Sequence, residues 1–177
     1  TLPDLPSNNV WTVLENDNGQ VYIGHVGHGM SIVSLKSGRV KNFRYNPQNK
    51  NGIPGDHVNC IYKDSTDNIW VGTEKGAALF DPKTEQFFPI NQFVNIPSTS
   101  TVFDIRQMGN NKIWIATELN GIFIIDLKQQ FYLSQGQIDP EHLTVGSDNY
   151  SLSNPTARCL FQDSFKNIWI GTYGGGI

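Results

Sequence analysis

Two histidines, His25 and His28, have the H-x-x-H spacing of a metal-binding pair. Imidazole is the commonest metal ligand in proteins, but a zinc site needs three or four ligands at suitable spacing. No third ligand follows this pair at the spacing of a zinc motif, and no helix is predicted around it. We therefore expect two loop histidines and no bound metal.

Two short runs have the composition of ion-binding loops. Residues 16–19 (NDNG) resemble the beginning of a calcium loop, but they lack the later ligands and the closing glutamate of that motif. The glycines at 174–176 could cradle a phosphate, yet neither Gly-Lys-Ser/Thr nor a helix follows them. Both runs therefore predict tight turns, and no cofactor is expected.

The sequence contains no recognisable motif for nucleophilic or acid–base catalysis. Cys60 and Cys159 form no CxxC or Cys/His pattern, and we expect two free thiols. There is no nucleophile elbow, no metal triad and no carboxylate pair on a recognisable scaffold. We assign no catalytic residue, and a glycosidase or lyase with acids drawn from several repeats is the remaining enzymatic alternative.

The composition limits the class of protein. The 177 residues are 38% hydrophobic and 11% aromatic, which predicts one domain with a substantial core rather than a disordered chain. A formal net charge of -3 disfavours nucleic acid as the main partner. The longest strongly apolar runs, such as residues 122–125, are far shorter than the ~18 residues of a membrane helix. We expect a soluble piece of a longer protein, since the chain starts at Thr1.

An internal repeat organises the chain. Residues 10–25, 58–73, 102–117 and 157–172 align without a gap, and their aromatic anchors lie 48, 44 and 55 residues apart. The anchors are Tyr22, Trp70, Trp114 and Trp169. A small residue stands two positions after each anchor: Gly24, Gly72, Ala116 and Gly171. Each segment ends in a threonine (Thr73, Thr117 and Thr172), except the first, which ends in His25. Such a period indicates a repeat architecture.

Each repeat predicts four short antiparallel strands. In the second repeat, residues 58–62, 69–71, 77–80 and 86–88 are rich in strand formers and are separated by turn residues. Units of ~40 to 50 residues have the length of a propeller blade, with the anchors packing between blades and the small residues allowing close approach. We predict an all-β fold with about three and a half blades of a seven-bladed β-propeller: blade 1 at about 8–50, blade 2 at about 56–97, blade 3 at about 100–150 and half of blade 4 at about 155–177. A two-sheet sandwich or a stacked solenoid is the alternative.

Ligand-binding residues are expected on the propeller face that carries the loops between second and third strands and the segments leading into each blade. Planar polar groups and aromatic rings there suit sugar hydroxyls and C–H faces. The candidates are His25, His28, Glu74, Lys75, Glu118, Asn120 and Tyr173, together with Asn8, Asn9, Asp56, His57 and Asn154. The same residue types are common in turns for conformational reasons, so turn stabilisation is the alternative role.

Several segments resemble two-component-regulator propeller repeats. They are residues 5–10 (LPSNNV), 64–73 (DSTDNIWVGT), 151–154 (SLSN) and 163–177 (DSFKNIWIGTYGGGI). The family pattern runs approximately S-L-x-x-N-x-V, D-x-x-G-x-I-W-I-G-T and G-G-L, and the resemblance covers essentially the whole chain. Departures are Tyr22 and His25 in the first repeat, Met108 and Ala116 in the third, and Pro155 with Ala157 in the fourth.

The resemblance implies a fragment of the periplasmic sensor region of an inner-membrane hybrid two-component histidine kinase, as found in Bacteroides-type bacteria. Such proteins often carry two seven-bladed propellers, a small sandwich domain, a membrane helix and the kinase, and a minority have other output domains. Many detect oligosaccharides and switch on genes of glycan utilisation. The expected partners are therefore an oligosaccharide and the remaining domains of the parent protein. A dimerisation scaffold that binds no small molecule is the second function consistent with the sequence.

An arc of three and a half blades also predicts self-association. A propeller gains stability by closing, because an open array exposes apolar blade faces and unpaired strand edges. We expect two arcs to complete a seven-bladed ring.

Overall fold

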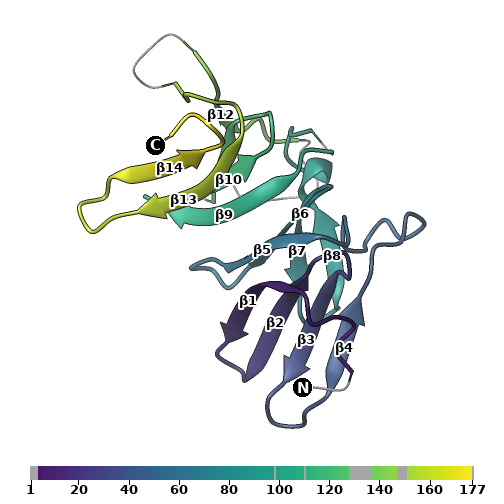
Figure 1. Cartoon of the computed structure of the whole chain (residues 1–177). Coiled ribbons are helices and arrows are strands. Elements are labelled where there is room, and N and C mark those ends of the chain that lie inside the picture. The colour runs from purple at the N-terminus through teal and green to yellow at the C-terminus, as the bar shows by residue number, and fades with distance from the viewer. Residues whose placement is uncertain (1–3, 98, 110, 128–136, 147–150, 177) are drawn as a thin grey trace.

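The computed structural model describes residues 4–97, 99–109, 111–127, 137–146 and 151–176. Within these ranges the strands form three four-stranded sheets and one two-stranded sheet, and strands that follow one another in the chain pair as antiparallel neighbours. Figure 1 shows the sheets succeeding one another along the chain, from β1–β4 near the N-terminus to β13–β14 near the C-terminus. The predicted all-β fold with four-stranded antiparallel blades is confirmed.

The strand bounds follow the repeat. Blade 1 contains β1 (Val10–Asn16), β2 (Gln20–His25), β3 (Met30–Ser34) and β4 (Val40–Phe43). Blade 2 contains β5 (Val58–Lys63), β6 (Ile69–Thr73), β7 (Gly76–Asp81) and β8 (Gln86–Pro89), followed by a 3-10 turn, η1 (Ile90–Gln92). Blade 3 contains β9 (Val102–Met108), β10 (Lys112–Thr117), β11 (Ile122–Asp126) and β12 (Glu141–Leu143), and the last sheet contains β13 (Ala157–Gln162) and β14 (Ile168–Thr172). No helix in the described ranges has the length and apolar content to cross a membrane.

The first strand of each blade forms the contact with its neighbours. β1 contacts β5, β5 contacts β9 and β9 contacts β13, while the second strand of each blade also contacts the first strand of the next. These contacts bring the four first strands together in chain order, as expected for the inner strands of propeller blades.

The aromatic anchors pack between blades, as predicted. Tyr22 lies in a cluster with residues of β5 to β8, and Trp70 lies in a cluster with residues of β9 to β11. Both side chains are fully buried. Trp114 is partly buried against the β13–β14 sheet, whereas Trp169 on β14 is 48% exposed. The burial of an anchor therefore follows the packing of the next sheet onto it, and this burial of apolar surface stabilises the contact between the sheets.

A second repeated contact joins the blades at the turns between first and second strands. Lys63, Gln107 and Gln162 occupy one repeat position, and each reaches the turn of the preceding blade. The Lys63 Nζ donates to Asp17 Oδ2 at 2.5 Å, which raises the pKa of Lys63. The Oε1 of Gln107 accepts the Ser65 N–H at 2.7 Å, and the Oε1 of Gln162 accepts the N–H of Gly109 at 3.3 Å. These bonds fix the register of one blade against the next.

The two cysteines are free thiols, as predicted. Cys60 is buried on β5, and burial raises the pKa of its thiol, while Cys159 is exposed on β13. At the same repeat position of β9 stands Asp104, whose carboxylate accepts the backbone N–H of Leu160 in the next sheet at 3.0 Å. Burial raises the pKa of Asp104.

Candidate functional site

The loops between second and third strands lie against the segment that leads into the following blade. The backbone N–H of Gly29 donates to the carbonyl of Asp56 at 2.7 Å, and that of Gly121 donates to the carbonyl of Pro155 at 2.7 Å. Gly29 has a φ of +70°, and a Cβ there would lie 2.0 Å from the carbonyl oxygen of Phe43. These loops and the segments leading into the next blades therefore lie side by side, and the ligand candidates must be sought there.

The acidic candidates stabilise these loops. Glu74 accepts the backbone N–H groups of Asp56 and His57 at 3.1 and 2.9 Å. Glu118 accepts the hydroxyl hydrogen of Thr101 at 2.8 Å. Both carboxylates therefore tie a loop to the start of the same blade, which is the turn-stabilising role.

The amide and lysine candidates also have partners within the protein. The Nδ2 of Asn120 donates to the hydroxyl oxygen of Ser100 at 2.8 Å. The Nζ of Lys75 lies 4.1 Å from the centroid of the Tyr45 ring, a cation–π contact. The Lys75 side chain is exposed beside this ring.

His25 does not lie in a loop, so its predicted position is wrong. It is the last residue of β2 and its side chain is fully buried, with Nε2 2.8 Å from Ser31 Oγ. In the other three repeats a threonine stands here and donates to a glycine carbonyl across the loop, as Thr73 does to Gly76 at 2.9 Å. Burial lowers the pKa of His25, and the electrostatic effect of His28 lowers it further by a smaller amount.

His28 remains in the loop, half buried, and contacts the carbonyl of Val26 at 3.1 Å. Among the described residues, no three His, Cys, Asp or Glu side chains gather as metal ligands would. The runs at residues 16–19 and 174–176 lie at the turn joining β1 to β2 and at the loop following β14.

Four residues that the sequence did not single out as ligand contacts share one place in the inner strands. In each pair of first and second strands the register shifts by one residue, close to the loops that join second and third strands. The residue left without a partner in the register is Trp11, Asn59, Phe103 or Arg158. We call these four residues the bulge row. A β-bulge re-aims the side chain of its extra residue, and bulges are frequent beside functional sites.

Two members of the bulge row, Asn59 and Arg158, make contacts with β9 of blade 3. The Nδ2 of Asn59 donates to the carbonyl of Val102 at 2.9 Å, next to Phe103 in the following blade. The guanidinium carbon of Arg158 lies 4.0 Å from the centroid of the Phe103 ring and 5.4 Å from that of Tyr173. Tyr173, a predicted ligand candidate, thus contacts the row.

The remaining member, Trp11, is 64% exposed and meets the ring of His57 edge-on, with centroids 6.0 Å apart. The only hint in the sequence was that Trp11 is the tryptophan that lies off the repeated anchor position. The bulge row thus presents one exposed aromatic ring, that of Trp11, and planar polar groups at the end of the inner strands where the loops gather, which is chemistry for binding rather than for bond cleavage.

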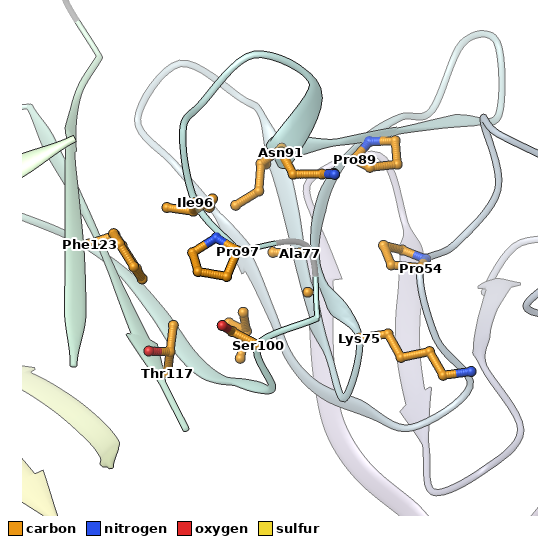
Figure 2. A pocket seen from close by; sticks show the side chains of 13 residues that line it. Pro54, Lys75, Ala77, Pro89, Asn91, Ile96, Pro97, Ser100, Thr117 and Phe123 are labelled. Carbon is orange, nitrogen blue, oxygen red and sulfur yellow. The ribbon is translucent and has the colours of Figure 1, made fainter. Parts of the chain in front are cut away.

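Two hollows lie along the described strands. The first, between blades 2 and 3, is lined by Lys75, Ser100 and Phe123 among others (Figure 2), and its volume of about 20 Å³ holds about one water. The second is lined by inner-strand residues only, including Tyr62, Arg106 and Phe161, and has a volume of about 410 Å³. The first is too small for a sugar ring, and the second lies beside the turns between first and second strands, at the other end of the inner strands from the bulge row.

Comparison with known proteins places this geometry in context. The two component regulator propeller family matches residues 52–75 and 151–174. Histidine kinase P4 of Formosa agariphila is 31% identical over 176 residues, which are 97% of this chain and 12% of that protein.

Solved structures show the same arrangement of blades. The extracellular domain of the hybrid two component system BT3049 from B. thetaiotaomicron superposes with a TM-score of 0.81 and 49% identity over 99% of this chain, which is 20% of that domain. The extracellular domain of the hybrid two component system BT4673 from the same organism superposes with a TM-score of 0.77 at 19% identity, covering 94% of this chain and 22% of that one, and supports the fold. The chain thus spans about a fifth or less of these relatives.

Proposed function

Because this chain carries two-component regulator propeller repeats, we propose that it is part of the extracytoplasmic sensor propeller of a hybrid two-component protein and that it binds an oligosaccharide. The proposed localisation is the periplasmic side of an inner-membrane protein. The chain itself supplies binding, and the histidine kinase chemistry belongs to other parts of the parent protein.

The bulge row carries the proposal. Its exposed aromatic ring at Trp11 and its planar polar groups at Asn59 and Arg158 are the side chains that bind sugar C–H faces and hydroxyls. The four residues of the row lie on the inner strands of four consecutive sheets, so one ligand that contacts several of them would change how neighbouring blades fit together. A ligand that binds one arrangement more tightly shifts the population toward it, and the kinase would respond by switching on genes of glycan utilisation.

The test is a binding screen of the whole chain against plant and host oligosaccharides, followed by titration calorimetry. We expect at least one oligosaccharide to bind, and Trp11→Ala to weaken its affinity by at least about tenfold because an aromatic contact is lost. The matched control is Phe165→Ala, which removes an aromatic side chain that is 85% exposed on the turn between β13 and β14.

Affinity should be unchanged in the Phe165 variant. Equal losses in the two variants would remove the bulge row as the binding site. Failure of every oligosaccharide to bind would contradict the proposed function itself.

Self-association is a second proposal, favoured by exposed apolar side chains at both ends of the blade array. Val13 on β1 is 59% exposed, and Phe161 and Trp169 on the β13–β14 sheet are 63% and 48% exposed. We propose that the β1 face of one copy packs on the β13–β14 face of another, in the way that successive blades pack within the chain.

Sedimentation over a concentration series tests this association. The average mass should rise from the 19.8 kDa of one chain toward that of a dimer. Trp169→Glu should return the mass to that of the monomer, whereas Leu35→Glu, at an apolar residue between β3 and β4 that is 59% exposed, should not. A constant mass of one chain at all concentrations would contradict the proposal.

A further inference from the structure

Arg158 is held in a defined position by aromatic rings from two elements. It is the bulged residue of β13, passed over between Ala157 and Cys159, and its side chain is exposed. The Phe103 ring of β9 lies 4.0 Å from the guanidinium carbon, and the Tyr173 ring, in the loop after β14, lies 5.4 Å from it. Cation–π contacts of this kind orient a guanidinium without neutralising its charge.

The charge of Arg158 is not matched by an acidic partner among the residues that the structure describes. Arg44 and Arg106, by contrast, pair with Asp56 and Asp104 at 3.0 Å. Asp104, the nearby carboxylate of β9, is already engaged, since its Oδ1 binds Arg106 and its Oδ2 accepts the N–H of Leu160. Arg158 is therefore an oriented cation within a row of sugar-binding residue types.

This arrangement suits one class of ligand group. When aromatic rings contact a guanidinium, its N–H groups remain available at the edge of the plane, and two of them match the two oxygens of a carboxylate. We propose that the bulge row binds an acidic oligosaccharide, with the carboxylate of a uronic acid residue accepting hydrogen bonds from Arg158. This inference rests on the proposed oligosaccharide binding and adds the class of sugar.

The experiment compares oligosaccharides that differ only in charge. An array carries uronic acid oligosaccharides beside their methyl esters, in which the same sugars lack the negative charge. The wild-type chain should bind the best acid at least about tenfold more tightly than its ester, as expected for a charge-assisted pair of hydrogen bonds. Added salt should reduce this preference.

Two variants assign the preference to Arg158. Arg158→Gln should bring the ratio of acid to ester affinity close to one while ester binding is retained, and Arg158→Lys should keep only part of the ratio because lysine lacks the planar fork. The control is Arg39→Gln, which removes another exposed arginine, before β4, and should leave the ratio unchanged. Circular dichroism confirms that each variant is folded.

The outcomes separate this inference from the proposal on which it rests. If the wild-type chain binds sugars but does not distinguish acid from ester, or if Arg39→Gln lowers the ratio as much as Arg158→Gln, the assignment of an acidic ligand is overturned and oligosaccharide binding stands. If no sugar of either kind binds, the proposed function fails and the inference fails with it.

Discussion

Replacing Asp64 with alanine will lower the free energy of unfolding by about 3 kcal/mol, because the change removes a buried, charged hydrogen-bond acceptor with several donors. Asp64 is 3% exposed, at the turn between β5 and β6. Its Oδ2 accepts the indole N–H of Trp70 at 2.8 Å, and Trp70 is the fully buried anchor between blades 2 and 3. The substitution therefore affects both the turn and the packing between two blades.

The other donors to Asp64 belong to the turn itself. The backbone N–H and hydroxyl of Thr66 donate to Oδ1 at 2.8 and 2.7 Å, and the backbone N–H of Asn68 donates to the same oxygen at 3.0 Å. The Nδ2 of Asn68 donates to Oδ2 at 2.9 Å. This set explains why the second and fourth repeats have an aspartate, an asparagine four residues later and a tryptophan six residues later.

Asp163 provides a matched control. It accepts the same kind of bonds from the backbone of Phe165 and Asn167, the Asn167 side chain and the Trp169 indole, at 2.8 to 3.0 Å. Trp169 is 48% exposed, so water can replace the lost acceptor. Urea unfolding of Asp163→Ala should show a much smaller loss than Asp64→Ala. Equal losses in the two variants would show that burial of the anchor does not set the strength of the bond.

The pH dependence follows from the same contacts. Burial raises the pKa of Asp64, but hydrogen bonds from Trp70, Asn68 and Thr66 together outweigh it, so the folded pKa lies below the ordinary value. The stability that Asp64 contributes is therefore fully present above its unfolded pKa of about 3.9 and is lost as the pH falls through the folded pKa. The difference between wild type and Asp64→Ala should be constant near neutral pH and shrink in acid.

The fold was predictable because its signals recur. The spacing of Trp70, Trp114 and Trp169 and the turn residues between them identified four-stranded units, since each blade must solve the same packing problem with similar residues. Burial of each anchor was less predictable, because it depends on the sheet that packs next to it. Trp169 therefore has nearly the same neighbours in sequence as Trp70 and a different exposure.

The candidate site was only partly predictable. Alignment of the repeats drew attention to loop residues, and two of these, Glu74 and Glu118, bind the protein's own loops. The bulge row was not predicted, because its members have the same backbone position but differ in residue type. They are Trp11, Asn59, Phe103 and Arg158. A register shift between paired strands is decided by both strands together, and single-strand propensity does not report it.

The second large loss of stability is expected from a substitution of the small residue that stands two positions after an anchor. Gly72 on β6 has no positive φ, so alanine would be tolerated by its backbone and would favour a strand by ~0.5 to 1 kcal/mol. A Cβ at this position, however, would lie 2.5 Å from Cys60 Sγ and 2.8 Å from Val102 Cγ1 of the next blade. We expect Gly72→Ala to destabilise the chain by about 2 to 3 kcal/mol, the usual cost of overpacking a tight core.

The third repeat shows how this contact is relieved. It has Ala116 in place of the glycine, and the following blade has Ala157 at the position of Val102. Both alanines are fully buried in one cluster, so a larger residue on one blade is matched by a smaller one on the next. The exchange of Gly72 and Val102 for two alanines would reproduce the pairing that the protein already uses between blades 3 and 4.

A double-mutant cycle tests this pairing by urea unfolding. Val102→Ala alone should destabilise by leaving a cavity, but Gly72→Ala and Val102→Ala together should cost less than the sum of the single changes, with a coupling of about 1 to 2 kcal/mol. Gly171→Ala is the control, because a Cβ there meets only the Sγ of the exposed Cys159. It should be nearly neutral. Additive losses at Gly72 and Val102 would mean that the clash with Cys60, within the blade, rather than the contact between blades, requires glycine.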